Sequence, residues 1–353
     1  MTVTVDASPQ EIRSRACPDC YLCGSPGTPL YQGLRDRLFG APGQWNLKQC
    51  LNSRCRLVWL DPMPLEGDIA KAYTAYYTHS DSSRKNGVGR SFLRQVFHFA
   101  KDGYLARRFG YATSDSGFQK LAGLVFYLSP TYRAAVEKSV CGLQPCPGGR
   151  LLDVGCGDGD VVARLSALGW QAEGVDVDPE AVKHACTKGL KVRLGDLESQ
   201  AYPASCFDVV TMNHVIEHVH DPVRLLRECH RILKPGGRLV AFTPNLDSRG
   251  HRSFKDNWFA LDPPRHLYLL NPPALRALAE RASFKLQSIS TSFHGSHGIA
   301  LASRAIAHQG FYVPKSVPSL SESLRASAFS LAEWGLHKFD PSLGEQLILV
   351  GEK

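Results

Sequence analysis

The chain lacks a long apolar segment, and this absence excludes a conventional membrane-spanning helix. Such a helix needs roughly 18 or more consecutive apolar residues. The longest apolar run, Leu121 to Leu128, is interrupted by Gly123. Residues 1–13 also lack a basic stretch followed by an apolar core, so no secretory signal is recognised. We therefore expect a cytoplasmic protein.

A strong excess of charge of one sign is lacking as well. The formal net charge is +8 over 353 residues, which permits attraction to nucleotides, phosphates or lipid headgroups but does not require it. The cysteine-rich N-terminal region has no dense basic helix, so we expect no sequence-specific nucleic-acid binding. Apolar residues make up 43% of the chain and charged residues 21%, which is typical of a globular protein of two or three domains.

Cysteine, in contrast, is plentiful. Eleven cysteines without a secretory signal indicate thiols and metal ligands rather than disulfides. Two pairs, Cys20/Cys23 and Cys50/Cys55, lie on short turns separated by a hairpin-like stretch, which is how a zinc ribbon presents four thiolates. Cys17 and Cys20 form a competing first pair. Four cysteine ligands leave no open coordination position, so the predicted zinc is structural.

A glycine-rich turn follows a short apolar stretch in the middle of the chain. Glycine occupies positions 155, 157 and 159, directly after Leu151–Val154. This pattern predicts a buried strand that ends in a tight loop where a cofactor can lie against the backbone. The spacing differs from the dinucleotide fingerprint, and Asp153 would repel a pyrophosphate but attract an ammonium group. The loop therefore favours S-adenosylmethionine (SAM) over NAD.

The segment Leu-Leu-Asp-Val-Gly-Cys-Gly-Asp-Gly at 151–159 resembles the first motif of Rossmann-like SAM-dependent methyltransferases. Later motifs of that family are resembled as well. They are a strand at 207–213, a helix, the segment Leu-Lys-Pro-Gly-Gly at 233–237 and a further strand at 238–243. The resemblance implies an α/β fold with a mostly parallel sheet and an antiparallel last strand. The cofactor-binding residues that it implies are Asp153, Gly155, Cys156, Gly157, Asp176, Val177, Asp196, Leu197 and Asn213. Asp176 would bind the ribose, with Asp178 as the near alternative, and Asp196 would face the adenine.

The domain organisation follows from these motifs. We predict a flexible tail over 1–16, a zinc ribbon over 17–62, a helical substrate or linker region over 63–145 and a methyltransferase domain over 146–353, with a lid-like insertion at 293–342. The ribbon resembles the zinc-binding domain that precedes the methyltransferase fold in some sugar- and natural-product-modifying enzymes.

A basic amphipathic helix is predicted within 84–108. It could contact an anionic membrane or a lipid-linked substrate, or it could present an ordinary solvated face. A tyrosine-rich patch at 73–79 could stack on a sugar or a base, or pack in the core. The sequence does not decide whether the protein forms a homodimer.

Histidine is the natural base for methyl transfer to a hydroxyl. The candidates for catalysis are His266, His218, His214, His294 and His297. The triplet His214, Glu217 and His218 resembles the metal-contacting triplet of some quinone-biosynthesis O-methyltransferases, although that pattern has Glu at the first position. The loop 262–267 resembles one that closes over the substrate in related enzymes, where Arg265 could hold an anion and His266 could act as base. The same residues could instead form a capping network at the start of a helix. The segment 293–298 is similar to a His-Gly-Gly-Ser segment of sugar-nucleotide C-methyltransferases.

Our first interpretation is a SAM-dependent methyltransferase acting on a hydroxyl of a sugar, a glycan precursor or a natural-product intermediate. Methylation of carbon or nitrogen by the same fold is the alternative. An interaction protein that uses a methyltransferase fold as a scaffold is a third interpretation. The acids Asp153, Asp176 and Asp196 argue against a scaffold, because a pocket that no longer binds its cofactor need not retain them.

Overall fold

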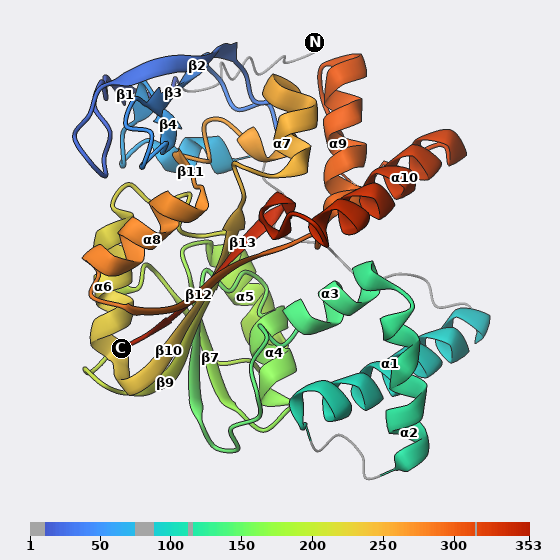
Figure 1. The fold of residues 1–353 in the computed structure, drawn as a ribbon. Helices are drawn as coiled ribbons and strands as arrows, with labels where there is room; N and C mark the ends of the chain where they lie inside the picture. Colours follow the sequence, from blue (N-terminus) through green and yellow to red (C-terminus); the bar gives the residue numbers. More distant parts are fainter. Residues whose placement is uncertain (1–10, 75–87, 112–115, 315) are drawn as a thin grey trace, which may run out of the picture.

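The computed structural model describes residues 11–74, 88–111, 116–314 and 316–353, without the side chains of 88–91 and 93. These residues form three sheets surrounded by helices (Figure 1). Most of the tyrosine-rich patch, the N-terminal end of the basic segment 84–108 and residues 1–10 of the expected tail lie outside the described residues.

A seven-stranded sheet forms the centre of the molecule, in the order β12-β13-β10-β9-β6-β7-β8. Strands β10, β9, β6, β7 and β8 run parallel, whereas β13 is antiparallel to both of its neighbours. The expectation of a mostly parallel sheet with an antiparallel last strand is confirmed. The strands are β6 (Arg150–Val154), β7 (Gln171–Asp176), β8 (Val192–Leu194), β9 (Phe207–Asn213), β10 (Leu233–Pro244), β12 (Lys285–Ser292) and β13 (Gln346–Glu352).

Helices cover both faces of this sheet. Helices α6 (Pro222–Ile232) and α8 (Pro272–Arg281) pack on one face, and α4 (Asp160–Ser166) and α5 (Pro179–Thr187) pack on the other. Helix α6 shows why. Its buried residues Val223, Leu226 and Cys229 recur every three positions, which makes one apolar stripe. Such helices bury both faces of the parallel strands and leave their carboxyl ends free for a site.

The N-terminal unit shares its sheet with the rest of the chain. Strands β2 (Gly27–Leu34), β3 (Trp45–Cys50) and β4 (Val58–Leu60) are joined by β11 (Tyr268–Leu269), in which Tyr268 pairs with Trp59. A two-stranded sheet pairs β1 (Ser14–Arg15) with β5 (Met63–Pro64). The flexible tail expected over 1–16 is therefore wrong for the strand residues 14 and 15, because their backbone is held by strand pairing.

The helical region lies beside the sheet and is followed directly by β6. It contains η1 (Ile69–Tyr73), α1 (Val88–Phe109), α2 (Gly117–Ala122), η2 (Gly123–Tyr127) and α3 (Pro130–Lys138). Two glycines allow α1 to lie against α2 and η2. A Cβ on Gly103 would lie 1.8 Å from the Gln119 carbonyl oxygen, and one on Gly123 would lie 2.4 Å from the Tyr104 nitrogen. No side chain fits at either crossing.

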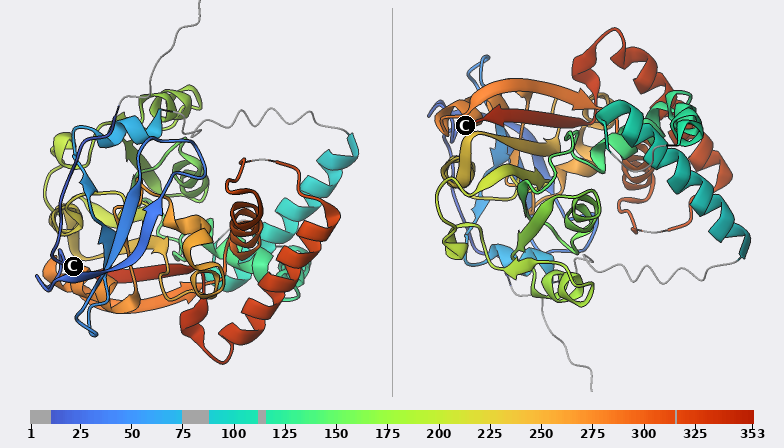
Figure 2. Two further views of the ribbon diagram at one scale, coloured as in Figure 1. Left: turned by 90° about the horizontal axis from the view of Figure 1, so that it is seen from above. Right: turned by 90° about the horizontal axis from the view of Figure 1, so that it is seen from below.

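The insertion between β12 and β13 is helical. It contains α9 (Ser296–Gln309), α10 (Leu320–His337) and η6 (Pro341–Leu343), and α10 begins with a capping box formed by Ser319 and Glu322. These helices lie on the same side of the molecule as α1–α3 in every view (Figure 2). The remaining helices are α7 (Arg249–Phe254), η3 (Glu198–Gln200), η4 (Lys255–Asn257) and η5 (Phe259–Leu261). None of the described helices is both long enough and apolar enough to cross a bilayer.

Candidate active site

The glycine loop connects β6 to α4 at the carboxyl edge of the sheet. Gly155, Gly157 and Gly159 all have positive φ angles, which favour glycine. A Cβ on Gly155 would lie 2.4 Å from Val215, whereas one on Gly157 would meet nothing within 4 Å. The backbone at Gly157 therefore borders open space. Cys156 is buried, and a Cβ on Gly174 would lie 2.5 Å from its sulfur, so Cys156 can serve a cofactor only through its backbone.

Asp176 ties the glycine loop to the end of β7. One carboxylate oxygen accepts a hydrogen bond from the Gly157 amide (2.7 Å), and the other accepts one from the Asp178 amide (2.9 Å). Each oxygen keeps a further lone pair. Asp176 therefore has the acceptor capacity to bind two hydroxyl groups. Asp178 is engaged otherwise, because its carboxylate caps α5 through the amides of Glu180 and Ala181.

Asp153 lies beneath the loop and is almost fully buried. Thr211 donates a hydrogen bond of 2.6 Å to its carboxylate. Burial raises the pKa of Asp153 to about 7, and the charge of Asp176 acts in the same direction, against the Thr211 hydrogen bond. A cation bound nearby would favour the ionised carboxylate.

Asn213 ends β9 and contains an unpartnered buried atom. Its Oδ1 has no hydrogen-bond partner among the described residues. A buried amide oxygen without a donor costs free energy, so a ligand that donates a hydrogen bond here would be favoured. The ammonium group of SAM is such a donor. Together with the cradle at Gly157 and the free lone pairs of Asp176, this residue fits SAM.

Two apolar side chains extend from neighbouring strand ends. Val177, just after β7, is 70% exposed and Leu194, at the end of β8, is 54% exposed. Exposed apolar groups beside Asp176 suit the flat face of a base. Asp196 is exposed, and one of its carboxylate oxygens accepts a hydrogen bond from the Ser199 amide (2.7 Å). Leu197 is buried.

Just after the end of β9, the half-buried His214 pairs with the fully buried Glu217. His214 adopts a left-handed backbone with φ 56°, a strained conformation that often marks functional sites. Its Nδ1 lies 2.9 Å from the Glu217 carboxylate, whose other oxygen accepts the Thr243 hydroxyl (3.0 Å). Burial alone would raise the pKa of Glu217, but the His214 hydrogen bond and the neighbouring imidazoles hold that pKa at about 2.

The chain of hydrogen bonds continues to Lys138 on α3. The Gln346 amide nitrogen lies 2.8 Å from Nε2 of His214, and its oxygen accepts a hydrogen bond from the Lys138 ammonium (3.2 Å). Burial lowers the pKa of Lys138 to about 8. Lys138 and Gln346 were not predicted from the sequence, because no motif marks them.

His294 lies close to this chain. Burial lowers its pKa to about 4, and the charges of Lys138 and His214 act in the same direction. At neutral pH His294 is therefore an uncharged imidazole, the form that accepts a proton. His297 follows it in the first turn of α9 and is half-buried.

His218 and His266 lie further inside. Nδ1 of His218 is 3.0 Å from the Arg265 carbonyl oxygen, Nδ1 of His266 is 2.7 Å from the Ala260 carbonyl oxygen, and the ring centroids are 4.6 Å apart. Each ring can donate from Nδ1 and keep Nε2 unprotonated, the tautomer that binds metals. Glu217, His218 and His266 each offer a ligand atom within 4.8 Å of the others, so these three residues could hold a cation.

Arg265 does not face a substrate. Its side chain is fully buried and forms a two-point ion pair with Asp36, at distances of 2.7 and 2.9 Å. It also contacts Asp262 and donates to the Ala72 carbonyl oxygen. The expectation that Arg265 holds an anionic substrate is therefore wrong, because carboxylates of the chain itself occupy the guanidinium.

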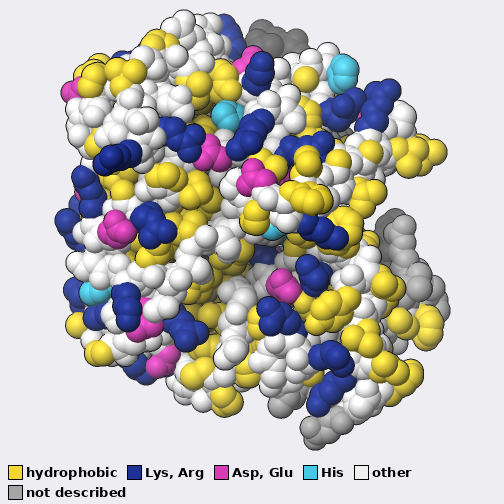
Figure 3. All heavy atoms as spheres, in the orientation of Figure 1, with side chains coloured by type: hydrophobic (Ala, Val, Ile, Leu, Met, Phe, Trp, Pro, Cys, Tyr) yellow, Lys and Arg dark blue, Asp and Glu magenta, His cyan; other side chains and the backbone are white. Residues whose placement is uncertain are grey.

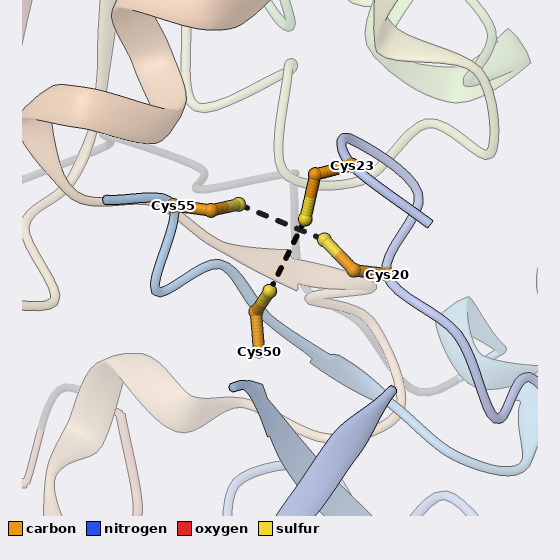
Figure 4. Close-up of side chains that lie close together, drawn as sticks. All are labelled: Cys20, Cys23, Cys50 and Cys55. Atoms are coloured by element: carbon orange, nitrogen blue, oxygen red, sulfur yellow. Dashed lines mark hydrogen bonds between the residues drawn. The ribbon is translucent and has the colours of Figure 1, made fainter. Parts of the chain in front are cut away.

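Four cysteine sulfurs converge in the N-terminal unit, as Figure 4 shows. The Cys20 and Cys55 sulfurs are 3.7 Å apart, and the Cys23 and Cys50 sulfurs are 3.3 Å apart. All four lie within 4.8 Å of one another. Zinc bonds of ~2.3 Å in a tetrahedron place sulfurs ~3.8 Å apart, so the arrangement fits a zinc ion. The competing ligand Cys17 is not in this group.

Comparisons with known proteins agree with the geometry. Residues 127–289 match a family model described as "Methyltransferase domain". Ubiquinone biosynthesis O-methyltransferase of Xanthomonas axonopodis pv. citri (strain 306) is 41% identical over 110 residues, which cover 29% of this chain and 46% of that protein. The homologous enzyme of Xanthomonas euvesicatoria pv. vesicatoria (strain 85-10) is 42% identical over 106 residues, covering 28% and 44%. The chain thus spans less than half the length of these curated relatives.

A solved SAM-dependent methyltransferase from Archaeoglobus fulgidus is 20% identical, with a TM-score of 0.43, and covers 67% of this chain and 100% of its own. A TM-score this low does not by itself establish a shared fold. The family match includes the glycine loop, Asp176, Asn213 and His266, but not the cysteine cluster, His294 or Gln346. Residues 127–289 thus resemble a methyltransferase domain, and the match indicates SAM-dependent methyl transfer as the enzyme class.

Proposed function

We propose that the protein transfers the methyl group of SAM to a hydroxyl of a small molecule, such as a sugar, a glycan precursor or a natural-product intermediate. The observation that carries the proposal is the cradle formed by the open backbone at Gly157, the free lone pairs of Asp176 and the unpartnered Asn213 oxygen. The names of the matched relatives support oxygen as the acceptor atom.

The residues of the cradle have complementary roles in this proposal. Asp176 accepts the two ribose hydroxyls, Asn213 accepts a hydrogen bond from the ammonium group, and Val177 contacts the base. Asp153 adds negative charge beneath the ammonium. Bound SAM would supply an electrophilic methyl group on a sulfonium.

The acceptor side lies beyond the carboxyl ends of β9 and β10 and the first residue of the antiparallel β13. With SAM bound, the acceptor oxygen would take the methyl group, and the electron pair of the broken carbon–sulfur bond would stay on sulfur as a neutral thioether. The acceptor's proton must leave, and His294 is the candidate base because its uncharged ring lies beside Lys138. His214 has both ring nitrogens in hydrogen bonds, and His218 and His266 lie further inside, where each is held through Nδ1 by a backbone carbonyl oxygen.

We expect Asp176→Ala to weaken SAM binding at least about tenfold, because charge-assisted hydrogen bonds contribute ~1.5–3 kcal/mol. Calorimetric titration with SAM and S-adenosylhomocysteine measures the affinity. Asp178→Asn keeps an oxygen that can cap α5, and it should bind SAM normally. Equal affinity of Asp176→Ala and the parent protein would remove the ribose assignment. A folded parent protein that binds neither compound would overturn the proposed function and favour a scaffold.

We expect His294→Ala to lower turnover ~10²–10⁴-fold with SAM affinity unchanged, since it removes a general base outside the cradle. The assay uses an acceptor found by screening hydroxyl compounds. Because the pKa of His294 is lowered, the neutral ring persists down to about pH 4. The acid limb of the rate profile should therefore lie well below the usual histidine range. His297→Ala is the matched variant and should retain activity. Loss of turnover in His266→Ala alone would move the base to His266.

A further inference from the structure

The helices α1, α2 and η2 expose a concentration of large apolar side chains. Phe92, Val96 and Phe99 follow one stripe of α1, and they are 67%, 49% and 38% exposed. A second stripe consists of Phe118 and Leu121 on α2 and of Leu128 directly after η2, and these residues are 72%, 60% and 84% exposed. Monomeric proteins seldom leave so many large apolar groups uncovered, and such patches mark interaction sites.

The two stripes belong to one surface. The rings of Phe99 and Phe118 lie 6.0 Å apart, and this contact joins α1 to α2. The close crossing at Gly103 and Gly123 fixes the relative position of the helices. We name the surface formed by Phe92, Val96, Phe99, Phe118, Leu121 and Leu128 the apolar face.

The charges on the same helices are almost all positive. Exposed basic side chains are Arg94, Arg107, Arg108 and Lys120. The only acids among the described residues from 92 to 137 are Asp102 and Glu137. Asp102 pairs with Arg164 at 3.1 Å, and Glu137 lies 3.9 Å from Arg108. Figure 3 shows apolar and basic side chains together over these helices, at the lower right.

The charge distribution decides which of two partners covers the apolar face, a second copy of the chain or an anionic bilayer. In a symmetric dimer the same patch meets itself, so this excess of arginine and lysine would face its own copy and repel it. The core of a stable interface is also depleted of charge. An anionic bilayer has the opposite properties, because its acyl boundary accepts apolar side chains and its headgroups attract lysine and arginine.

We propose that the apolar face and its surrounding basic residues dock the protein onto the surface of an anionic phospholipid bilayer. The contact is peripheral, since none of the described helices can span a bilayer. The same helical unit leads through α3 to Lys138 and thus to the acceptor side of the candidate active site. The docking surface itself does not depend on the proposed chemistry.

The test is flotation of the full chain with vesicles of phosphatidylcholine alone or of phosphatidylcholine mixed with phosphatidylglycerol. We expect binding to the mixed vesicles only, with a loss at high salt, because screening weakens headgroup attraction. The double variant Phe92→Ser/Phe118→Ser should bind at least about tenfold more weakly, since two large apolar groups no longer enter the acyl boundary. Phe339→Ser, also at an exposed phenylalanine (89%) but outside α1–η2, should bind normally.

Circular dichroism and light scattering accompany each variant. Equal binding of the double variant and the parent protein would overturn the proposal, as would absence of vesicle binding in a folded parent protein. A parent dimer that becomes monomeric in the double variant, without vesicle binding, would assign the apolar face to a second copy of the chain instead. Reduced binding by a folded, monomeric double variant would support the bilayer.

Discussion

Replacing Cys50 with serine is expected to lower the free energy of unfolding by about 4–5 kcal/mol or more and to abolish stoichiometric zinc. Loss of a structural metal lowers the free energy of unfolding by more than an ordinary point mutation does. Cys50 ends β3, and its amide donates to the Leu57 carbonyl oxygen, so the thiolate lies where the sheet turns back towards Cys55. Three remaining thiolates would hold zinc less tightly and repel one another once it is lost.

Metal analysis and thermal unfolding of the same samples measure both effects. Cys146→Ser is the matched control because Cys146 is also a free cysteine but is exposed. We expect it to retain zinc and stability. Cys17→Ser should do so as well, since Cys17 lies outside the cluster. A folded parent protein without zinc would contradict the zinc assignment, and zinc loss in Cys17→Ser would restore the competing ligand pair.

Replacing Arg265 with methionine should cost about 3–5 kcal/mol of unfolding free energy, because it leaves buried carboxylates without a counter-charge. One guanidinium joins three parts of the molecule: Asp36 after β2, the Ala72 carbonyl oxygen in η1, and Asp262 in the loop that precedes β11. It also lies 4.8 Å from the centroid of the Phe39 ring. Methionine conserves much of the volume but none of the five donors.

The loss of stability should depend on pH in a defined direction. Burial would raise the pKa of Asp36, but the Arg265 hydrogen bonds and charge outweigh it and hold the pKa below its usual value. A depressed carboxyl pKa contributes stability above its unfolded value, and that stability is lost as the pH falls through the folded value. The difference between Arg265→Met and the parent should therefore be largest near neutral pH and smaller in acid.

Chemical unfolding at several pH values checks this prediction. Arg276→Met is the control, because Arg276 lies 3.9 Å from Glu280 in an exposed pair and should change stability by only ~0.5 kcal/mol. A pH-independent loss in Arg265→Met would show that packing, not the buried charges, causes the effect.

The sequence predicted those parts of the site that are local in the chain. The glycine loop and the strand before it lie within ten residues, and the backbone angles of the loop require glycine. The cysteine spacing likewise predicted four ligands that converge. These patterns are readable because each couples a residue type to a nearby backbone geometry.

Long-range contacts could not be predicted in this way. The sequence left open whether Arg265 holds an anion or belongs to a capping network. Its partner Asp36 is far away in the sequence, and nothing local reveals the pairing. Lys138 and Gln346 meet only after α3 packs beside β13. Contacts of this kind become visible only in the structure, because no rule of sequence spacing predicts which distant residues meet.

Strand β11 has a consequence for how the chain folds during synthesis. It completes the sheet of the cysteine-bearing unit, since Tyr268 pairs with Trp59 and Leu269 with Val58. The ribosome releases β2, β3 and β4 long before it releases β11, and non-local pairings of this kind fold slowly. Until then β4 has an unpaired edge, which is a site for unwanted strand pairing. Early metal capture by the four cysteines would hold the nascent unit together while its last strand is still being translated.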